Sequence, residues 1–292
     1  MTTSLRHDVQ AVLGAVTRYA EARDFAGPDP YDLLASPLPL RSLPPAVSFL
    51  LTQVHKRNPL SLRRALRIPP VLMPKAAGLF LKAYALLQQQ PGSPDYTPQM
   101  TWLFDWIVEH SIETERGWSW GLPFAYSSLT KFQPPHTPSA VVTAFIHDGV
   151  CEYLQATGDE RARAVVEAAT AFVVHELPRT ETEAGLCFSY TPIQRDECFN
   201  ANALIARMLA RTYALTGDTH LRDLAQASIA YTVAKQRPEG YWNYRIKGDG
   251  TEKRQVDFHQ GFILDSLIDY EAYAGDADPA IRNAIERGAR FY

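Results

Sequence analysis

Apolar residues recur at intervals of three and four positions through most of the 292-residue chain. This spacing places them on one face of a helix and predicts a largely helical protein. The expected helices cover residues 5–23, 71–90, 97–112, 139–156, 160–177, 200–215, 219–236, 258–273 and 279–292. Prolines interrupt the pattern between the first two helices, among them Pro28, Pro30, Pro37, Pro39, Pro44, Pro45 and Pro59. Because proline breaks helices, we expect residues 1–70 to form an irregular wrap with short helical pieces.

A turn between two helices repeats in the second half of the chain. The segments are YLQATGDERAR, YALTGDTHLR and YEAYAGDADPAIR, and their glycines, Gly158, Gly217 and Gly275, lie 59 and 58 residues apart. Each segment is typical of a helix that ends on a left-handed glycine and is followed by an Asp N-cap. The repeat therefore predicts tight helical hairpins over residues 71–292.

The loops that join these hairpins also resemble one another. GWSW (117–120), GLCFSY (185–190) and GYWNY (240–244) each place aromatic residues two apart after a glycine, as in a short extended segment. Loops of roughly 20 residues are longer than most connections and are usually functional. Since only one edge carries long loops, the pattern favours a ring of hairpins with the loops gathered at one mouth.

The sequence thus predicts an all-α chain, a single domain over residues 1–292 with an α/α toroid that is incomplete or irregular in its N-terminal part. We expect the more apolar segments AVVTAFIHDGVCEYL, NANALIARMLARTYAL and FHQGFILDSLIDYEAY to line the inside. The amphipathic segments ERARAVVEAATAFVV and HLRDLAQASIAYTV should form the outer layer. The last helical pattern shows no stop signal, which is compatible with a chain that extends beyond Tyr292.

This arrangement resembles the α/α toroids. These include the six-hairpin glycosidase superfamily, with its polysaccharide lyase and uronyl-epimerase relatives, and the terpenoid-cyclase and prenyltransferase toroids. Gln236, Gly240 and Trp242 look like the Q-x-x-x-G-x-W motif of the terpenoid-cyclase group, and Glu113 with Gly117 and Trp118 is a degenerate copy. The acidic D-x-D-D cyclisation motif of that group is absent. Residues 57–87 and 256–267 are similar to uncharacterised toroid proteins encoded with bacterial surface-polysaccharide genes. The resemblance implies the toroid fold and, more weakly, a carbohydrate substrate.

Composition narrows the functional classes. With 46% hydrophobic and 21% charged residues, a net charge of −3 and a pI near 6.2, the chain is typical of a soluble globular protein with no global attraction for nucleic acid. No signal peptide or 18-residue apolar run is present, and three unpaired cysteines favour a reducing compartment, so we expect a cytoplasmic protein. The oligomeric state is left open. The basic run HKRNPLSLRRALR (55–67) fits a membrane or partner contact, but a solvated face is favoured.

The inner helices should begin near Pro138, Asn200 and Phe258, with their N-termini at the mouth. Free N–H groups and helix dipoles favour anions there. Aligning the hairpins on their glycines superposes three residues at one inner position: Thr143, Asn202 and Gln260. Asp257 and His259 then belong at the rim of the mouth.

Seven aromatic residues of the loops are candidates for stacking on sugar rings. They are Trp118, Trp120, Tyr126, Tyr190, Tyr241, Trp242 and Tyr244. The alternative is that the tryptophans pin the loops onto the helix ends, and this is favoured for Trp118 and Trp242. For Tyr190 and Tyr244 both interpretations stay open.

Titratable loop residues suggest two kinds of chemistry. Hydrolysis needs two carboxylates, which Glu197 and Asp257 would supply. Elimination or epimerisation needs a base, Tyr244 or His259, and groups that stabilise the developing negative charge, such as Arg245, Asn200 or a helix N-terminus. Arg195 is a further substrate-binding candidate. Simpler alternatives are an N-cap role for Asp257, a capping or supporting role for His259, and an ordinary surface carboxylate at Glu197.

Metal binding is a weaker alternative. Cys198, Asp257 and His259, with Cys187 in the same loop, match the residue types that hold zinc in prenyltransferase and lanthionine-cyclase relatives. The C-x-x-C and H-x-x-x-H spacings of a strong zinc signal are missing, so we expect buried structural cysteines and no cofactor. His147, next to Asp148 within an inner helix, is expected to be a satisfied core histidine.

We therefore expect a carbohydrate-active protein that acts on a polysaccharide or glycan intermediate by lyase, epimerase or hydrolase chemistry. Its cavity should be lined by Trp120, Tyr190, Tyr244 and His259. The alternative is a non-catalytic glycan-binding or scaffold toroid of polysaccharide biosynthesis. A terpenoid-cyclase-like toroid is a third option, which the charged rim disfavours.

Overall fold

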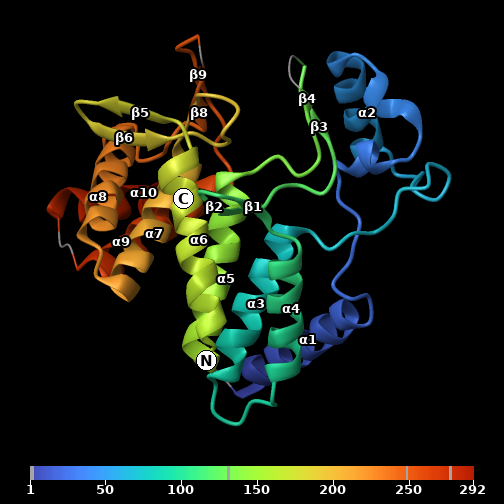
Figure 1. Ribbon diagram of the computed structural model, residues 1–292, viewed down its shortest axis with the longest axis horizontal. Coiled ribbons are helices and arrows are strands. Elements are labelled where there is room, and N and C mark those ends of the chain that lie inside the picture. Colours follow the sequence, from blue (N-terminus) through green and yellow to red (C-terminus); the bar gives the residue numbers. More distant parts are fainter. Residues whose placement is uncertain (1–2, 130–131, 248, 276–277) are drawn as a thin grey trace. The chain divides into compact units, whose positions relative to one another are not determined.

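Helices dominate the protein, as the hydrophobic periodicity predicts. A computed structural model describes residues 3–129, 132–247, 249–275 and 278–292 (Figure 1). Its helices are α1 (Thr3–Glu21), α2 (Pro45–Arg57), α3 (Pro74–Gln88), α4 (Thr97–Glu109), α5 (Ala140–Thr157), α6 (Glu160–Glu176), α7 (Phe199–Thr216), α8 (Thr219–Ala234), α9 (His259–Ala274) and α10 (Pro279–Phe291). Every predicted helix is present, with ends shifted by three residues or fewer. Within the irregular segment lie α2 and the 3₁₀ helices η1 (Asp32–Ala35) and η2 (Pro39–Ser42).

Short antiparallel strands occupy the long loops, where the sequence predicted only extended segments. The two-stranded pairs are β1 (Ile112–Thr114) with β2 (Gly117–Ser119), β3 (Tyr126–Ser127) with β4 (Phe132–Gln133), and β5 (Arg179–Thr182) with β6 (Gly185–Phe188). A three-stranded sheet is formed by β7 (Glu197–Cys198), β8 (Arg245–Ile246) and β9 (Glu252–Lys253). The β7–β8 pairing joins the loop before α7 to the loop before α9, and so brings two successive repeats together at the mouth.

The chain divides into two compact units. Unit 1 comprises Met1–Ala77 and Leu122–Thr137, and unit 2 comprises Gly78–Gly121 and Pro138–Tyr292. Unit 1 contains α1, α2, the two 3₁₀ helices and the β3–β4 pair, whereas unit 2 contains the helical hairpins from α4 onwards and most of α3. The single domain over residues 1–292 stays a prediction. None of the described helices is long and apolar enough to cross a membrane.

The hairpin turns follow the predicted chemistry. α5, α7 and α9 end on the left-handed residues Gly158, Gly217 and Gly275. The carboxylates of Asp159 and Asp218, which directly follow the first two glycines, accept backbone hydrogen bonds at the starts of α6 and α8. In the third hairpin the N-cap is Asp278, which accepts from the amide of Ala280. The aspartate that directly follows Gly275 lies outside the described residues.

Burial distinguishes an inner from an outer layer in unit 2. α5 is buried from Ala140 to Tyr153 and α7 from Phe199 to Thr212, so both are inner helices as predicted. α6 and α8 bury one face only, against α5 and α7. α9 packs against α7 but exposes Asp265 and Ile268. Its predicted inner position is therefore only half enclosed.

Three glycines hold the loops against the outer helices in the same way. Gly117, Gly185 and Gly240 adopt φ angles of 154°, 130° and 102°. A Cβ atom would lie 2.2 Å from the amide nitrogen of Phe172 at the first position, and 2.2 Å from the carbonyl oxygen of Ala227 at the second. At the third, it would lie 2.4 Å from a carbonyl oxygen of α10. Since no side chain fits these approaches, each loop is positioned by its glycine on the outer helix that follows it in the chain.

Candidate functional site

The predicted inner position of the three repeats is confirmed. Thr143 Oγ1 accepts a hydrogen bond from the backbone amide of Trp120 at 3.2 Å. Asn202 Oδ1 accepts one from the amide of Phe188 at 2.9 Å, and Gln260 Oε1 one from the amide of Trp242 at 2.8 Å. Each inner helix thus holds the loop that precedes it through one polar side chain. These hydrogen bonds fix the position of each loop relative to the N-terminus of the helix that follows it.

Asp257 and His259 form a dyad at the start of α9. Asp257 Oδ1 lies 2.5 Å from His259 Nδ1 and also accepts the backbone amide of His259 at 3.1 Å. Asp257 Oδ2 accepts a hydrogen bond from Gln255. Partial burial acts to raise the pKa of Asp257, but the hydrogen bonds from Gln255 and His259 outweigh it and hold that pKa below its usual value. An ionised Asp257 accepts the Nδ1 proton of a neutral imidazole, which leaves Nε2 of His259 as a proton acceptor.

Tyr244 supports this dyad from the side. Its ring lies 5.0 Å from the imidazole of His259 in an edge-on arrangement. Its hydroxyl hydrogen-bonds with the buried thiol of Cys198, and burial is the main cause of a pKa raised far above the usual tyrosine value. A tyrosine that stays protonated and faces a buried thiol is poorly suited to remove a proton. The contacts of Tyr244 with His259 and Cys198 suit a positioning role, and the base role that the sequence left open stays a prediction.

Arg245 lies next in the chain, on β8. Its Nη1 is 3.7 Å from Asp196 Oδ2, and Asp196 Oδ1 accepts the backbone amide of Tyr190. The carbonyl of Tyr190 accepts from the amide of Ala140, at the start of α5. Nε of Arg245 is buried without a hydrogen-bond partner among the described residues. A ligand cannot reach this buried atom directly, but the Arg245 side chain as a whole is 37% exposed, so its guanidinium group can still donate to a ligand oxygen.

The N-termini of α7 and α9 differ from those of α5, α6, α8 and α10. The side chains of Cys198 and Phe258, at the N-cap positions, make no capping hydrogen bond, whereas Ser139 and the aspartates cap α5, α6, α8 and α10. Asp257 accepts one amide of α9 from outside the cap position. The side chain of Asn200 points into the protein and not towards solvent, since its Oδ1 accepts a hydrogen bond from the thiol of Cys198 at 3.2 Å. The start of α7 is buried, however, and its first amide, that of Phe199, donates to the carbonyl of Tyr244 at 3.2 Å.

Glu197 does not join the rim. Its carboxylate hydrogen-bonds with the hydroxyl of Tyr231 on the outer helix α8. Successive side chains of a strand point to opposite sides, so Glu197 turns away from the side of β7 on which Cys198 is buried. The pairing of Glu197 with Asp257 across a scissile bond gains no support from this geometry.

The tryptophans mostly serve the architecture. Trp120 and Trp242 are fully buried, and their indole N–H groups donate to the carbonyls of Ile107 and Thr232 at 2.8 Å each. The expectation that Trp120 lines the cavity is therefore wrong, and neither ring is accessible for stacking on a sugar. Gln236 binds the carbonyls of Gly240 and Ala284, so the motif-like Gln236, Gly240 and Trp242 fasten their loop to α10.

The remaining candidates for substrate binding make contacts of their own or lie exposed in the loops. Tyr241 packs against Phe291 of α10 with ring centroids 5.1 Å apart. Tyr126 belongs to unit 1, where it contacts Tyr31. Arg195 is exposed in the loop before β7. Tyr190 and Tyr244 are half-buried in the rim loops, and they alone of the predicted aromatics stay candidates beside His259.

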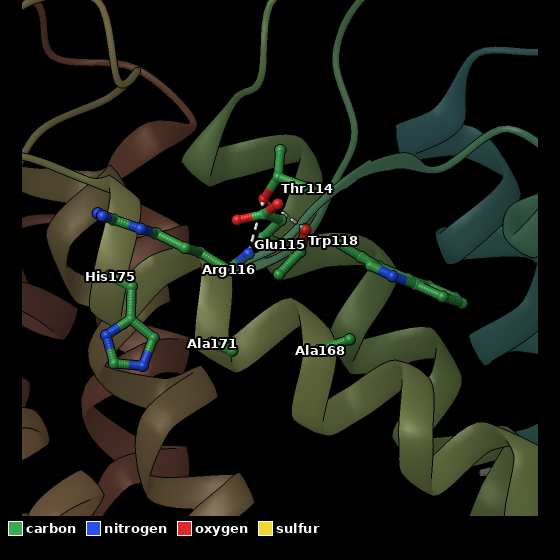
Figure 2. Close-up of a pocket in the computed structure, with 8 residues that line it drawn as sticks. Thr114, Glu115, Arg116, Trp118, Ala168, Ala171 and His175 are labelled. Carbon is green, nitrogen blue, oxygen red and sulfur yellow. Dashed lines mark hydrogen bonds between the residues drawn. The ribbon is translucent and has the colours of Figure 1, made fainter.

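Trp118 borders a hollow on the outer wall of unit 2. This hollow of about 620 Å³ lies between the β1–β2 turn and α6 (Figure 2). Its lining includes Thr114, Glu115 and Arg116 from the turn, and His175 from the end of α6. It is separate from the predicted mouth, since none of the dyad or rim residues lines it. A cavity bordered by Tyr190, Tyr244 and His259 stays a prediction.

Two aromatic residues at the rim were missed in the sequence. Phe258 is 58% exposed and stacks on His259, with ring centroids 4.3 Å apart. Phe262, one turn further along α9, contacts Phe258 and Phe145 edge-on. Their spacing of four residues on one helix face was the signal available in the sequence. An exposed aromatic ring beside a proton acceptor is suited to a sugar face.

No group of three or more His, Cys, Asp or Glu side chains among the described residues is arranged to hold a metal ion. Cys187 and Cys198 are both buried, and the thiol of Cys198 forms hydrogen bonds with Tyr244 and Asn200. The zinc alternative built on Cys187, Cys198, Asp257 and His259 therefore gains no support from the arrangement of these residues.

The three cysteines should be inert in the native protein. Burial raises the pKa of Cys151 and of Cys198 to about 12, and burial raises that of Cys187 well above its usual value. Because the thiolate is the reactive form, iodoacetamide at about pH 8 should modify none of them in the folded protein and all three in denaturant. Mass spectrometry of both samples measures this. Rapid labelling of Cys198 in the native state would show that the rim opens to its thiol.

His147 is a core histidine, as predicted. It is 1% exposed, and its Nε2 pairs with Thr212 Oγ1 at 2.9 Å. Burial, assisted by the charge of Arg211, lowers the pKa of His147 to about 3. An unfolded chain binds this proton near pH 6.5, so the folded state loses stability as the pH falls from 6.5 towards 3.

The unfolding free energy should therefore decrease with acidification more steeply in the wild type than in His147→Gln. The limiting difference is about 1.4 kcal/mol per pH unit below pH 6. Urea unfolding at a series of pH values between about 7 and 4 measures it, with the exposed-site variant His220→Gln as control. Parallel curves for the wild type and His147→Gln would show that His147 is protonated in the folded protein.

A second polar cluster lies deeper on the inner helices. Six charged side chains from α3, α5, α7 and α9 take part: Lys82, Asp148, Glu152, Arg207, Arg211 and Asp269. Asp148 accepts from Lys82 at 2.8 Å, from Arg207 at 3.3 Å and from Arg211 at 2.6 Å. Burial acts to raise the pKa of Asp148, but the charges of Arg207 and Lys82 outweigh it and hold that pKa below its usual value. The sequence indicates this cluster only through charged residues that lie four positions apart in apolar helices.

The hairpins and their loops define an α/α toroid fold, which the similar solved structures share. No family model and no curated protein matches the sequence. Among solved structures, the chain is similar to cellobiose 2-epimerase from Spirochaeta thermophila, with a TM-score of 0.58 and 14% identity over 91% of this chain and 75% of that one. A GH76 α-mannanase from Bacteroides thetaiotaomicron gives a TM-score of 0.58 and 12% identity over 75% and 60%. A D-mannose isomerase gives 0.56 and 13% over 75% and 58%. The chain thus spans about three fifths of the mannanase and of the isomerase.

Proposed function

We propose that this protein acts on a reducing sugar by moving a proton at the carbon next to the carbonyl group, the chemistry of an epimerase or isomerase. The observation that carries the proposal is the Asp257–His259 dyad. The imidazole is held by Nδ1, only 18% of its side chain is exposed, and no described residue hydrogen-bonds its Nε2. Two of the proteins whose structures share the fold are named for such chemistry, a cellobiose 2-epimerase and a D-mannose isomerase.

In the proposed reaction, Nε2 of His259 accepts the proton from the carbon beside the carbonyl. The electron pair of that C–H bond forms the C=C bond of an enediolate, and the carbonyl oxygen takes the negative charge. The guanidinium group of Arg245, whose side chain is 37% exposed, is the donor suited to this oxygen. Returning the proton to the opposite face of the same carbon re-forms the carbonyl group and yields an epimer. Returning it to the former carbonyl carbon, while the hydroxyl proton of the neighbouring carbon moves to the former carbonyl oxygen, yields a ketose. No oxidant or cofactor is required.

Hydrolysis is the less suitable chemistry for this rim. It needs one carboxyl group as acid and a second as base or nucleophile. Asp257 is engaged by His259 and Gln255, and Glu197 by Tyr231. The proposed reaction of this chain therefore differs from the hydrolysis for which the mannanases of the same fold are named.

Proton exchange with solvent tests the proposal directly. The protein is incubated in D₂O with mannose, glucose, cellobiose and a uronic acid, and NMR follows the signal of the proton beside the carbonyl. We expect replacement of that proton by deuterium on at least one neutral sugar, together with the epimer or ketose. Release of new reducing ends from mannan without exchange would contradict it in favour of hydrolysis. Binding of a sugar without exchange or cleavage would favour the non-catalytic glycan-binding alternative.

A further inference from the structure

Helix α2 in unit 1 buries its polar face and exposes its apolar face. Its buried residues are Ser48, Thr52 and His55, which follow one another at helical spacing. Its exposed large side chains are Val47, Leu50, Leu51 and Val54, with exposed fractions of 43%, 62%, 38% and 59%. These four positions have the i, i+3, i+4, i+7 spacing of a continuous stripe. A surface helix of a soluble protein normally has the opposite orientation, so this stripe calls for a partner.

Specific polar contacts fix the helix in this orientation. Ser48 Oγ donates to the carbonyl of Leu40 at 3.2 Å. His55 Nε2 lies 3.1 Å from Asp32 Oδ1, and Arg63 Nε donates to Asp32 Oδ2 at 2.9 Å. Asp32 is 1% exposed, so this acidic group is an internal anchor for α2 and for the segment that follows it. Turning the apolar stripe inward would break these contacts and leave a buried carboxylate without its partners.

Basic residues accompany the stripe in the sequence. The sequence from Leu33 to Pro94 contains no Asp or Glu and eight Lys or Arg residues, in a chain whose net charge is −3. Arg57, Arg64 and Arg67 are exposed and form no ion pair with a described acidic residue. Two further apolar side chains among them, Leu60 and Leu62, are 72% and 43% exposed. Apolar and cationic groups therefore share one continuous stretch of chain, residues 47–67.

We propose that α2 and residues 58–67 dock this protein onto an anionic lipid surface. The exposed aliphatic side chains would enter the boundary between headgroups and acyl chains, and the arginines would bind the phosphate groups. The stripe contains no aromatic residue for stacking on bases, which disfavours nucleic acid. A protein partner would have to match both the aliphatic stripe and the arginines around it. The proposal is independent of the rim dyad, since none of its residues belongs to the proposed reaction.

Vesicle co-sedimentation of the full chain tests the proposal. The probes are vesicles of phosphatidylcholine mixed with phosphatidylglycerol, and vesicles of phosphatidylcholine alone. We expect binding to the mixed vesicles that weakens with salt, and little binding to the neutral ones. Arg57→Gln with Arg64→Gln should weaken the partition roughly 30-fold. Leu50→Ser with Val54→Ser should weaken it by a factor of ten or more, by removing the inserted side chains.

Matched variants elsewhere control for a general change in surface character. Leu79→Ser with Ile268→Ser replaces two aliphatic side chains that are 42% and 50% exposed on α3 and α9, and both should leave binding unchanged. Circular dichroism of every variant confirms the fold before binding is compared. Equal loss in the control and α2 variants would overturn the proposal. The proposal would also be overturned if the protein formed a dimer without vesicles and the variant Leu50→Ser with Val54→Ser were monomeric. Binding to duplex DNA in place of vesicles would overturn it as well.

Discussion

His259→Gln should reduce the rate of proton exchange beside the sugar carbonyl by a factor of about 10² to 10⁴. Glutamine keeps a polar side chain of similar reach, but it cannot accept a proton at neutral pH. The effect should appear in the rate constant at saturating sugar, since the imidazole acts on the proton that is transferred. Deuterium incorporation followed by NMR over a range of sugar concentrations measures it.

Two comparisons make this result specific. Asp257→Asn should also slow exchange, because an amide no longer holds the Nδ1–H tautomer of His259. His220→Gln, at the exposed start of α8, should leave the rate at the wild-type value. Undiminished exchange in His259→Gln would remove the dyad from catalysis. If both histidine variants slowed exchange equally, the loss would reflect general damage and the assignment of His259 would fail.

The helical hairpins could be predicted from the sequence because their signals are local. The periodicity located the helices to within three residues, and Gly158 and Gly217 were each followed by the Asp that caps the next helix. The alignment on these glycines placed Thr143, Asn202 and Gln260 at one position, and all three bind the loop before their helix. The same alignment predicts a rim position for Asp257 and His259, which stays a prediction.

Other features depend on which residues meet across the fold, and no local pattern encodes that. Strand pairing turned Glu197 towards Tyr231 and away from the dyad, which a list of titratable residues does not reveal. The indole of Trp120 can be buried because its N–H donates a hydrogen bond to the carbonyl of Ile107 in α4. α2 shows the limit most clearly, since its apolar stripe was visible in the sequence while the buried Asp32 that orients it outward was not apparent.

The ionic cluster of the inner helices is another such feature, and its central carboxylate should be essential for stability. We expect Asp148→Ala to lower the free energy of unfolding by about 3 to 5 kcal/mol. Asp148 is 4% exposed, and the side chains of Arg207 and Arg211 beside it are 8% and 9% exposed. Without the carboxylate, two guanidinium groups stay buried with less compensating charge. Urea unfolding monitored by circular dichroism measures the difference.

Asp148→Asn separates charge from shape, because the amide fills the same space but donates where the arginines need an acceptor. It should lose nearly as much stability as Asp148→Ala. Asp105→Ala, which removes the 55% exposed partner of Arg161, should cost no more than about 1 kcal/mol. A small loss in Asp148→Asn would show that Glu152 and Asp269 suffice to neutralise the arginines. Since Asp148 joins α5 to α3 and α7, while Arg207 joins α7 to α9, a loosened cluster should also slow proton exchange at the rim, where α7 and α9 present their N-termini.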